Sequence, residues 1–238
     1  MDAISDETRP VTTWKTSNTA GQFLQKELNG FAKGYWRDLM RSQPNHVELL
    51  VEKNTVEPIV QTIASRYTIP ITSGRGFCSI PPRQLMLQRF RKSGKERMVL
   101  IVASDFDPEG ESICESFARS MRDDFEVDIA CIKAALTYQQ TQELDLPPAL
   151  QAKETSSRYA GFNERYGDDV YELEALPPER LQELVDEAVR SVIDIDIFNR
   201  ELTSEKTDSQ WLDLKRRQLL AVMADVSIEE QSSDSTEG

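Results

Sequence analysis

A run of six apolar residues, Met98–Ala103, leads directly into an acidic turn and then into a helix-like segment. Continuous apolar character of this kind is typical of a central strand in a parallel sheet, which is covered on both faces. The turn reads Ser104-Asp105-Phe106-Asp107-Pro108-Glu109-Gly110-Glu111. A buried strand, a polar turn and a helix in this order predict an α/β fold.

The same alternation of strands and helices runs through most of the chain. The hydrophobic patterns predict strands at about 47–51, 69–72, 98–103 and 128–134, and an edge strand at 170–173. They predict helices at about 55–66, 81–91, 110–121, 137–144 and 178–193. Such an order is typical of parallel strands joined by right-handed crossovers. We therefore expect residues 45–200 to form a Rossmann-like domain with a central, mostly parallel sheet flanked by helices.

Both ends of the chain are expected to form helical arms outside this domain. Residues 1–44 are interpreted as an N-terminal arm or linker whose helix covers about 18–40. Its apolar residues recur at helical spacing, at Leu24, Leu28, Phe31, Tyr35 and Leu39. Residues 201–238 are expected to hold the end of a last helix, about 196–223, and a disordered acidic tail, EEQSSDSTEG.

Composition argues against several kinds of site and location. His46 is the only histidine, which argues against histidine-based metal centres and serine–histidine nucleophile pairs. Cys78, Cys114 and Cys131 lack CxxC spacing, so we expect reduced, buried thiols. Carboxylates must therefore carry any chemistry. The sequence contains neither a membrane-length apolar run nor a secretory signal, so we expect a cytoplasmic protein with no membrane association.

The net charge of −13 argues against a free-standing, high-affinity nucleic-acid binder. Residues 75–97 are a local exception, with seven Arg or Lys residues against a single acid, Glu96. This stretch can steer a polyanion, although a solvated helix face explains it equally well. The glycines of Ser73-Gly74-Arg75-Gly76 permit either close approach to a phosphate or simply a tight turn. As candidate DNA contacts we take Lys53, Gly74, Arg75, Gly76 and Arg83.

The acidic residues are expected to meet at one edge of the sheet. Asp105 and Asp107 share a side of the extended chain, and Glu52 ends the first strand as Asp105 ends the third. Crowded carboxylates repel one another, and Mg²⁺, which prefers oxygen ligands, removes that conflict. We therefore expect Glu52, Asp105 and Asp107 to bind Mg²⁺, with Glu109 as a further contributor. The alternative is a solvated loop whose charges favour a helix N-terminus.

The segments VEKNTVEPIV, SGRGF and SDFDPEG resemble the Toprim domain, most closely that of the DNA topoisomerase VI A subunit and the related meiotic double-strand-break proteins. The segment from Asp105 to Glu111 is also similar to the DxDxEGE form of type IA topoisomerases. The resemblance covers about residues 46–199. It implies that Glu52 is a general acid/base or metal ligand, and that Asp105 and Asp107 hold Mg²⁺. In that family, the metal helps a tyrosine to attack a DNA phosphodiester.

The sequence departs from the family upstream of Glu52, where no winged-helix domain with a nucleophilic tyrosine fits. Tyr35 is the only upstream tyrosine, and its spacing favours packing over catalysis. We expect the tyrosine to come from a missing region or another chain, and ATP-driven strand passage to need an ATPase subunit, because no Walker-type loop is present. The resemblance also implies a homodimer.

Three other functions stay open on the sequence alone. A Toprim nuclease would use metal-activated water, and a non-catalytic module would bind only DNA or a partner. A phosphatase with a DxD nucleophile is less favoured, because that chemistry usually places the pair on the first strand.

Overall fold

The computed structural model describes residues 14–74 and 80–233, and the chain divides into two compact units. One unit, which we call the sheet unit, spans Arg37–Ser204. The other combines the residues up to Trp36 with those from Glu205 onward. All the acidic residues of the predicted site belong to the sheet unit.

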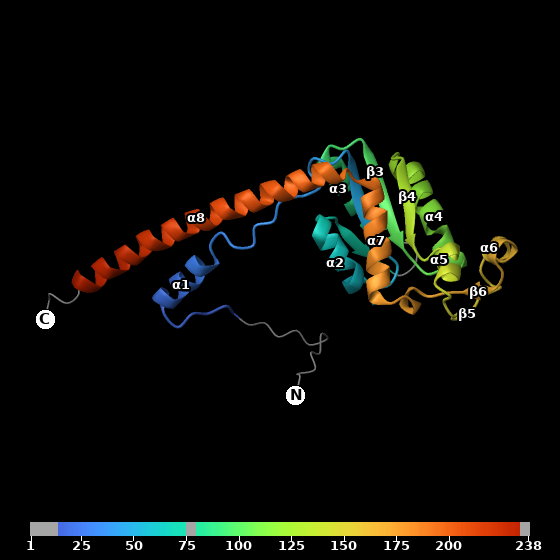
Figure 1. Ribbon diagram of the computed structural model, residues 1–238, viewed down its shortest axis with the longest axis horizontal. Helices are drawn as coiled ribbons and strands as arrows, with labels where there is room; N and C mark the ends of the chain where they lie inside the picture. Colours follow the sequence, from blue (N-terminus) through green and yellow to red (C-terminus); the bar gives the residue numbers. More distant parts are fainter. Residues whose placement is uncertain (1–13, 75–79, 234–238) are drawn as a thin grey trace, which may run out of the picture. The chain divides into compact units, whose positions relative to one another are not determined.

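Four parallel strands form the central sheet in the order β2-β1-β3-β4 (Figure 1). Their bounds are β1 (Asn45–Val51), β2 (Ile71–Ser73), β3 (Arg97–Ala103) and β4 (Ile129–Ala135). β3 lies inside the sheet, and its residues 100–102 are fully buried. This agrees with the apolar run in the sequence and confirms an α/β fold with a parallel sheet flanked by helices.

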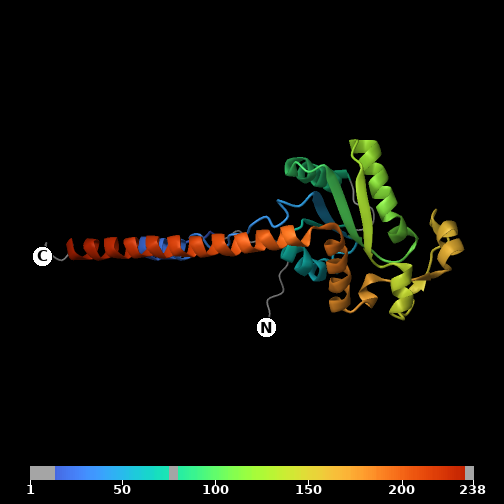
Figure 2. The same ribbon diagram turned by 45° about the horizontal axis from the view of Figure 1, so that its top comes forward.

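Helices cover both faces of this sheet (Figures 1 and 2). One face packs against α2 (Glu57–Tyr67) and α7 (Pro178–Val192), the other against α3 (Ile80–Ser93) and α4 (Pro108–Phe125). Because side chains alternate along a strand, odd-numbered residues of β1 and β3 face the first pair of helices and even-numbered ones face the second. The expected helices and parallel strands are thus present, with ends shifted by a few residues.

The edge strand predicted at 170–173 is wrong in its placement. β6 (Asp169–Val170) pairs antiparallel with β5 (Leu150–Gln151) in a separate two-stranded sheet. Residues 136–177, which connect β4 to α7, also contain α5 (Tyr138–Glu143), α6 (Tyr159–Tyr166) and the 3-10 turn η1 (Leu173–Ala175). Phe106 and Tyr171 exchange two backbone hydrogen bonds of 2.8 and 3.0 Å. The segment is therefore fastened to the acidic turn rather than to the main sheet.

The helix predicted over 18–40 is wrong in its second half. α1 covers only Ala20–Gly30, and Ala32 and Gly34 then adopt positive φ angles of 56° and 79°. Left-handed residues cannot continue a right-handed helix. Tyr35 therefore does not pack at helical spacing, and its hydroxyl instead donates a hydrogen bond to Asp208 Oδ2 at 2.8 Å.

The last helix is longer than its predicted end near residue 223. α8 covers Ile195–Ser233, a stretch without glycine or proline to stop it. It takes up the first residues of the tail expected to be disordered, and residues 234–238 lie outside the described part. None of the described helices combines the length and apolar character needed to cross a bilayer.

Two of the three cysteines are described, and both are free thiols. Cys114 of α4 and Cys131 of β4 are half-buried at the margin of the core. They are thus unpaired, as the spacing predicted, but less buried than expected. Cys78 lies outside the described residues.

A buried ion pair joins α3 to β1. Glu48 is fully buried, and its carboxylate accepts hydrogen bonds from Arg89 Nε at 2.7 Å and Arg89 Nη2 at 2.8 Å. His46 Nε2 lies 2.9 Å from the same carboxylate. A bidentate guanidinium is the partner that a buried carboxylate requires. Arg89, one of the basic residues that were candidates for steering a polyanion, therefore holds the fold together.

We expect Arg89→Ala to lower the free energy of unfolding by about 3 kcal/mol, because it leaves the buried Glu48 charge without its partner. The measurement is urea denaturation followed by circular dichroism. Arg91→Ala, an exposed position on the same helix, is the matched control and should change stability by less than about 0.5 kcal/mol. Equal stability of the two variants would show that the pair contributes nothing.

Candidate functional site

The carboxyl ends of β1 and β3 place Glu52 beside the acidic turn. Val51 is in register with Ala103, and the Glu52 N–H donates to the Ala103 carbonyl at 3.0 Å. Glu52 Oε2 then accepts a hydrogen bond from the Asp105 N–H at 3.1 Å. Glu52 and Asp105 are therefore direct neighbours, at the strand edge where open parallel sheets bind their ligands.

The Asp105 carboxylate is held by donors from two other parts of the chain. Its Oδ1 accepts a hydrogen bond from the Leu173 N–H at 2.9 Å, and its Oδ2 lies 2.9 Å from Lys53 Nζ. The backbone carbonyl of Asp105 accepts a further hydrogen bond from Lys133 Nζ at 3.0 Å. Only 8% of Asp105 is exposed, so these contacts replace most of its hydration.

Asp107 has a structural task of its own at the start of α4. Its Oδ1 accepts a hydrogen bond from the Gly110 N–H at 2.6 Å, which caps the helix. Gly110 is also required at its position, because a Cβ there would lie 2.1 Å from the Asp105 carbonyl oxygen. The glycine of the acidic motif thus lets the helix begin directly against the turn.

The three carboxylates of Glu52, Asp105 and Asp107 lie close enough to affect one another's ionisation. Burial, followed by the charges of Asp105 and Asp107, raises the pKa of Glu52 to about 7. Burial and the charge of Asp105 also raise the pKa of Asp107. Glu52 therefore exchanges a proton near neutral pH, as a general acid or base does.

Lys53 supplies the nearest positive charge to these carboxylates. Besides Asp105, its Nζ lies 2.8 Å from Glu174 Oε2 and 3.7 Å from Glu172 Oε2. Burial alone would lower the pKa of Lys53, but hydrogen bonds to Glu174 and Asp105 raise it above its ordinary value. The ammonium group therefore stays charged and partly neutralises the site.

Across the part of the chain that the structure describes, no three Asp, Glu, His or Cys side chains are grouped closely enough to hold a metal ion. At the sheet edge, Asp105 is engaged by Lys53 and Leu173, and Asp107 by Gly110. The carboxylates fit a hard cation in donor type and in their shared negative charge. Binding one requires side chains to move, and the Mg²⁺ site stays a prediction.

The other two acids of the motif are bound to side chains further along the chain. Glu109 Oε1 accepts a hydrogen bond from Ser156 Oγ at 2.8 Å, and Glu109 Oε2 one from Arg158 Nη1 at 2.6 Å. We call this contact the Glu109–Arg158 clasp. Glu111 pairs with Lys133 at 2.6 Å. The predicted fourth metal contributor, Glu109, thus uses both of its oxygens in holding the segment after β5.

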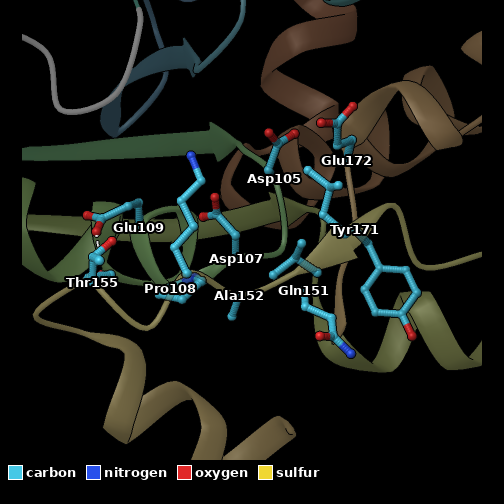
Figure 3. A pocket seen from close by; sticks show the side chains of 13 residues that line it. Asp105, Asp107, Pro108, Glu109, Gln151, Ala152, Thr155, Tyr171 and Glu172 are labelled. Carbon is cyan, nitrogen blue, oxygen red and sulfur yellow. Dashed lines mark hydrogen bonds between the residues drawn. The ribbon is translucent and has the colours of Figure 1, made fainter. Parts of the chain in front are cut away.

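A pocket of about 400 Å³, which we call the acidic pocket, opens beside Asp105 and Asp107 (Figure 3). The acidic turn forms one wall, and β5, β6 and the residues next to them form the other, including Lys153 and Thr155. Figure 3 shows Asp105 and Asp107 next to each other, and the hydroxyl of Tyr171 directed away from both. Asp105 and Asp107 therefore both line the wall of this pocket.

The candidate DNA contacts fall in different places. Lys53 lies at the acidic edge, and the Gly74 N–H donates to the Val51 carbonyl at 3.1 Å, which extends the β1–β2 pairing. Arg83 donates to Ser120 Oγ at 2.6 Å and stacks 5.1 Å from the Phe117 ring centroid, so it packs α3 against α4. Arg75 and Gly76 lie outside the described residues.

Several residues that shape the site were missed by the sequence analysis. Lys133 is a lone lysine near the end of an otherwise apolar strand, a signal that could have been used. Leu173, Ser156 and Arg158 come from irregular segments with no periodic pattern to place them. Their contribution depends on the backbone path, which the sequence pattern does not reveal.

Comparison of the sequence with models of known protein families and with curated proteins finds no match.

In metal-free buffer, we expect the stability of Glu52→Gln to increase relative to that of the wild type as the pH rises. The folded-state pKa of Glu52, about 7, lies above its ordinary value of 4.5, so ionisation costs the folded protein stability across this interval. Between about pH 5 and about pH 8, the stability difference should shift by about 1–2 kcal/mol in favour of the variant, after allowing for solvent screening.

Thermal or urea unfolding at the two pH values measures this shift. Glu164→Gln, an exposed position on α6, controls for the loss of one negative charge and should show a much smaller shift. A stability difference that does not change with pH would contradict the assigned pKa of Glu52.

Proposed function

We propose that the chain is a Toprim-like, Mg²⁺-dependent DNA-cleaving and rejoining module, resembling that of the topoisomerase VI A subunit. The observation that carries the proposal is the meeting of Glu52, Asp105 and Asp107 at one edge of a parallel sheet, with a pocket open beside them. The order of elements supports it, because a strand-end glutamate precedes the strand-end aspartate pair by two crossovers.

In this proposal, Glu52, Asp105 and Asp107 hold the Mg²⁺ ion. The bound ion would stabilise the charge that develops on a phosphodiester under attack. Asp105 would exchange Lys53 for the ion, and Lys53 could then face the incoming phosphate. Glu109 would reach the ion only by releasing Ser156 and Arg158, so we leave it out of the proposed ligands.

The protein's own groups support a role in proton transfer. Glu52 exchanges its proton near neutral pH, and Oε2 faces the backbone of the acidic turn. The Leu173 N–H holds the Asp105 carboxylate, and Lys133 holds the backbone carbonyl of the same residue, so Asp105 is positioned before a substrate arrives. Such preorganisation is what a site for phosphoryl transfer needs.

The attacking tyrosine is proposed to come from outside this chain, on a winged-helix domain, with an ATPase subunit for strand passage. Tyr35 bonds to Asp208, and Tyr171 directs its hydroxyl away from the two aspartates (Figure 3). These placements also favour a second function, a Toprim nuclease in which metal-activated water attacks the DNA. A covalent protein–DNA adduct distinguishes the two mechanisms.

The test incubates the chain with supercoiled plasmid DNA, with Mg²⁺ or with a chelator, and follows DNA binding, nicking and covalent adducts. Our proposal expects Mg²⁺ to strengthen DNA binding and expects this strengthening to be lost in Glu52→Gln and Asp105→Asn, without adducts from this chain alone. Nicking without an adduct would favour the nuclease. Binding that is indifferent to Mg²⁺ and to both substitutions would favour a non-catalytic module and overturn the proposal.

We expect Mg²⁺ to stabilise the fold. At ten times its dissociation constant, the ion adds about 1.4 kcal/mol, which raises Tm by about 3–5 °C. Asp105→Asn combined with Asp107→Asn should abolish this increase, because the ion loses two of its three proposed ligands. Differential scanning fluorimetry across a Mg²⁺ titration makes the measurement.

The matched control is Asp123→Asn combined with Asp124→Asn, a double charge removal near the far end of α4. This control should keep the full response to Mg²⁺. A response that is equal in both double variants, or absent from the wild type, would count against the site.

A further inference from the structure

A second hollow, of about 310 Å³, lies between α4 and α6. We call it the arginine hollow, because three guanidinium groups line it together with three serine hydroxyl groups. These residues are Arg119, Arg158, Arg165, Ser112, Ser116 and Ser157. The hollow is separate from the proposed Mg²⁺ site, and none of these six arginine and serine residues was a candidate from the sequence.

Two carboxylates, those of Glu111 and Glu115, also line the arginine hollow, and both are paired with a positive charge. Glu111 pairs with Lys133, which is largely buried behind it, and Glu115 pairs with Arg119 one helical turn away. Arg158 is engaged by Glu109 in the clasp. Arg165 is exposed and makes no ion pair with any residue in the ranges 14–74 and 80–233. The hollow therefore offers a guanidinium that is not committed within the described chain.

The lining combines the groups that bind nucleotides. Planar guanidinium groups match two oxygens of a phosphate, and serine hydroxyls can donate to a third. Phe162 and Tyr166 add aromatic rings to the same hollow. Aromatic side chains beside arginines are a recurrent feature of surfaces that bind single strands.

The arginine hollow adjoins the acidic pocket. Pro108 lines both, and of two consecutive serines Ser156 lines the acidic pocket and Ser157 the arginine hollow. The Glu109–Arg158 clasp runs between them, since Glu109 lines the first and Arg158 the second. A strand with one phosphate at the acidic edge would have a neighbouring phosphate within reach of the arginines.

We propose that the arginine hollow binds a backbone phosphate of a nucleic-acid strand, next to the phosphate that lies at Glu52, Asp105 and Asp107. The second half of this statement rests on the proposed function. Arg119 and Arg165 contact the phosphate, and Glu109 is a positioning residue that aims Arg158 into the hollow.

The test measures binding of a fluorescently labelled single-stranded oligonucleotide by anisotropy, at several salt concentrations and in the presence of a chelator. Arg119→Gln combined with Arg165→Gln should weaken binding about tenfold. It should also make the slope of log K against log salt shallower by about 0.7, since each phosphate neutralised on a single strand contributes about 0.7. Circular dichroism melts establish that the variant is folded.

Arg66→Gln combined with Arg122→Gln is the matched control, because it changes the net charge equally at exposed arginines outside the hollow. This control should keep most of the affinity and the salt slope. Equal losses in the two double variants would overturn the proposal, because the effect would then come from net charge. Absence of oligonucleotide binding by the wild type would overturn it as well.

Two further experiments distinguish this proposal from the proposed Mg²⁺ site and from a site for small phosphates. The double variant Asp105→Asn with Asp107→Asn should still bind the oligonucleotide in the presence of chelator. The double variant Arg119→Gln with Arg165→Gln should still be stabilised by Mg²⁺. Either proposal can therefore fail without the other. Inorganic phosphate is the competing ligand. If it binds the wild type in an arginine-dependent manner while the oligonucleotide does not bind, the hollow is a site for small phosphates and strand binding is refuted.

Discussion

The parallel pairing of β1 with β3 decides what the edge of this sheet contains. The register that places Val51 opposite Ala103 forces the next residues, Glu52 and the acidic turn, into the same small space. The Asp105 N–H then donates to the Glu52 carboxylate, so backbone and side chain hold the two strand ends together. A shift of one residue in the register of β1 would turn Glu52 to the opposite face of the sheet and separate its carboxylate from those of Asp105 and Asp107. The chemistry of the site therefore depends on strand register before it depends on any individual side chain.

Acids brought together in this way must be neutralised, because like charges at a half-buried edge repel strongly. The structure uses three means. Lys53 forms an ion pair with Asp105. The Asp107 carboxylate accepts a hydrogen bond from the Gly110 N–H at the N-terminus of α4. Glu52 keeps its proton up to near-neutral pH. A divalent ion or a substrate that brings its own counter-ions would compete with the protein's own neutralisation.

The sequence predicted those parts of the fold that rest on continuous hydrophobic patterns. The buried run at β3 and the following Asp105 were placed at the sheet edge because parallel strands share their carboxyl ends. The Glu109–Arg158 clasp could not be predicted, since it depends on the path of an irregular segment. Tyr35 was misplaced because its helical spacing continued past Gly30, where left-handed residues end α1.

The segment between β4 and α7 has the weakest sequence signal in the sheet unit, yet it lines both the acidic pocket and the arginine hollow. Its short strands and turns have no periodicity, yet it forms one wall of the acidic pocket and supplies Arg158 and Arg165 to the arginine hollow. Irregular segments positioned by a rigid sheet commonly carry binding residues. In a chain with a net charge of −13, a polyanion cannot be attracted by the average field. Under our proposal, attraction of a strand would have to be local, and the guanidinium groups of the arginine hollow between α4 and α6 would provide it.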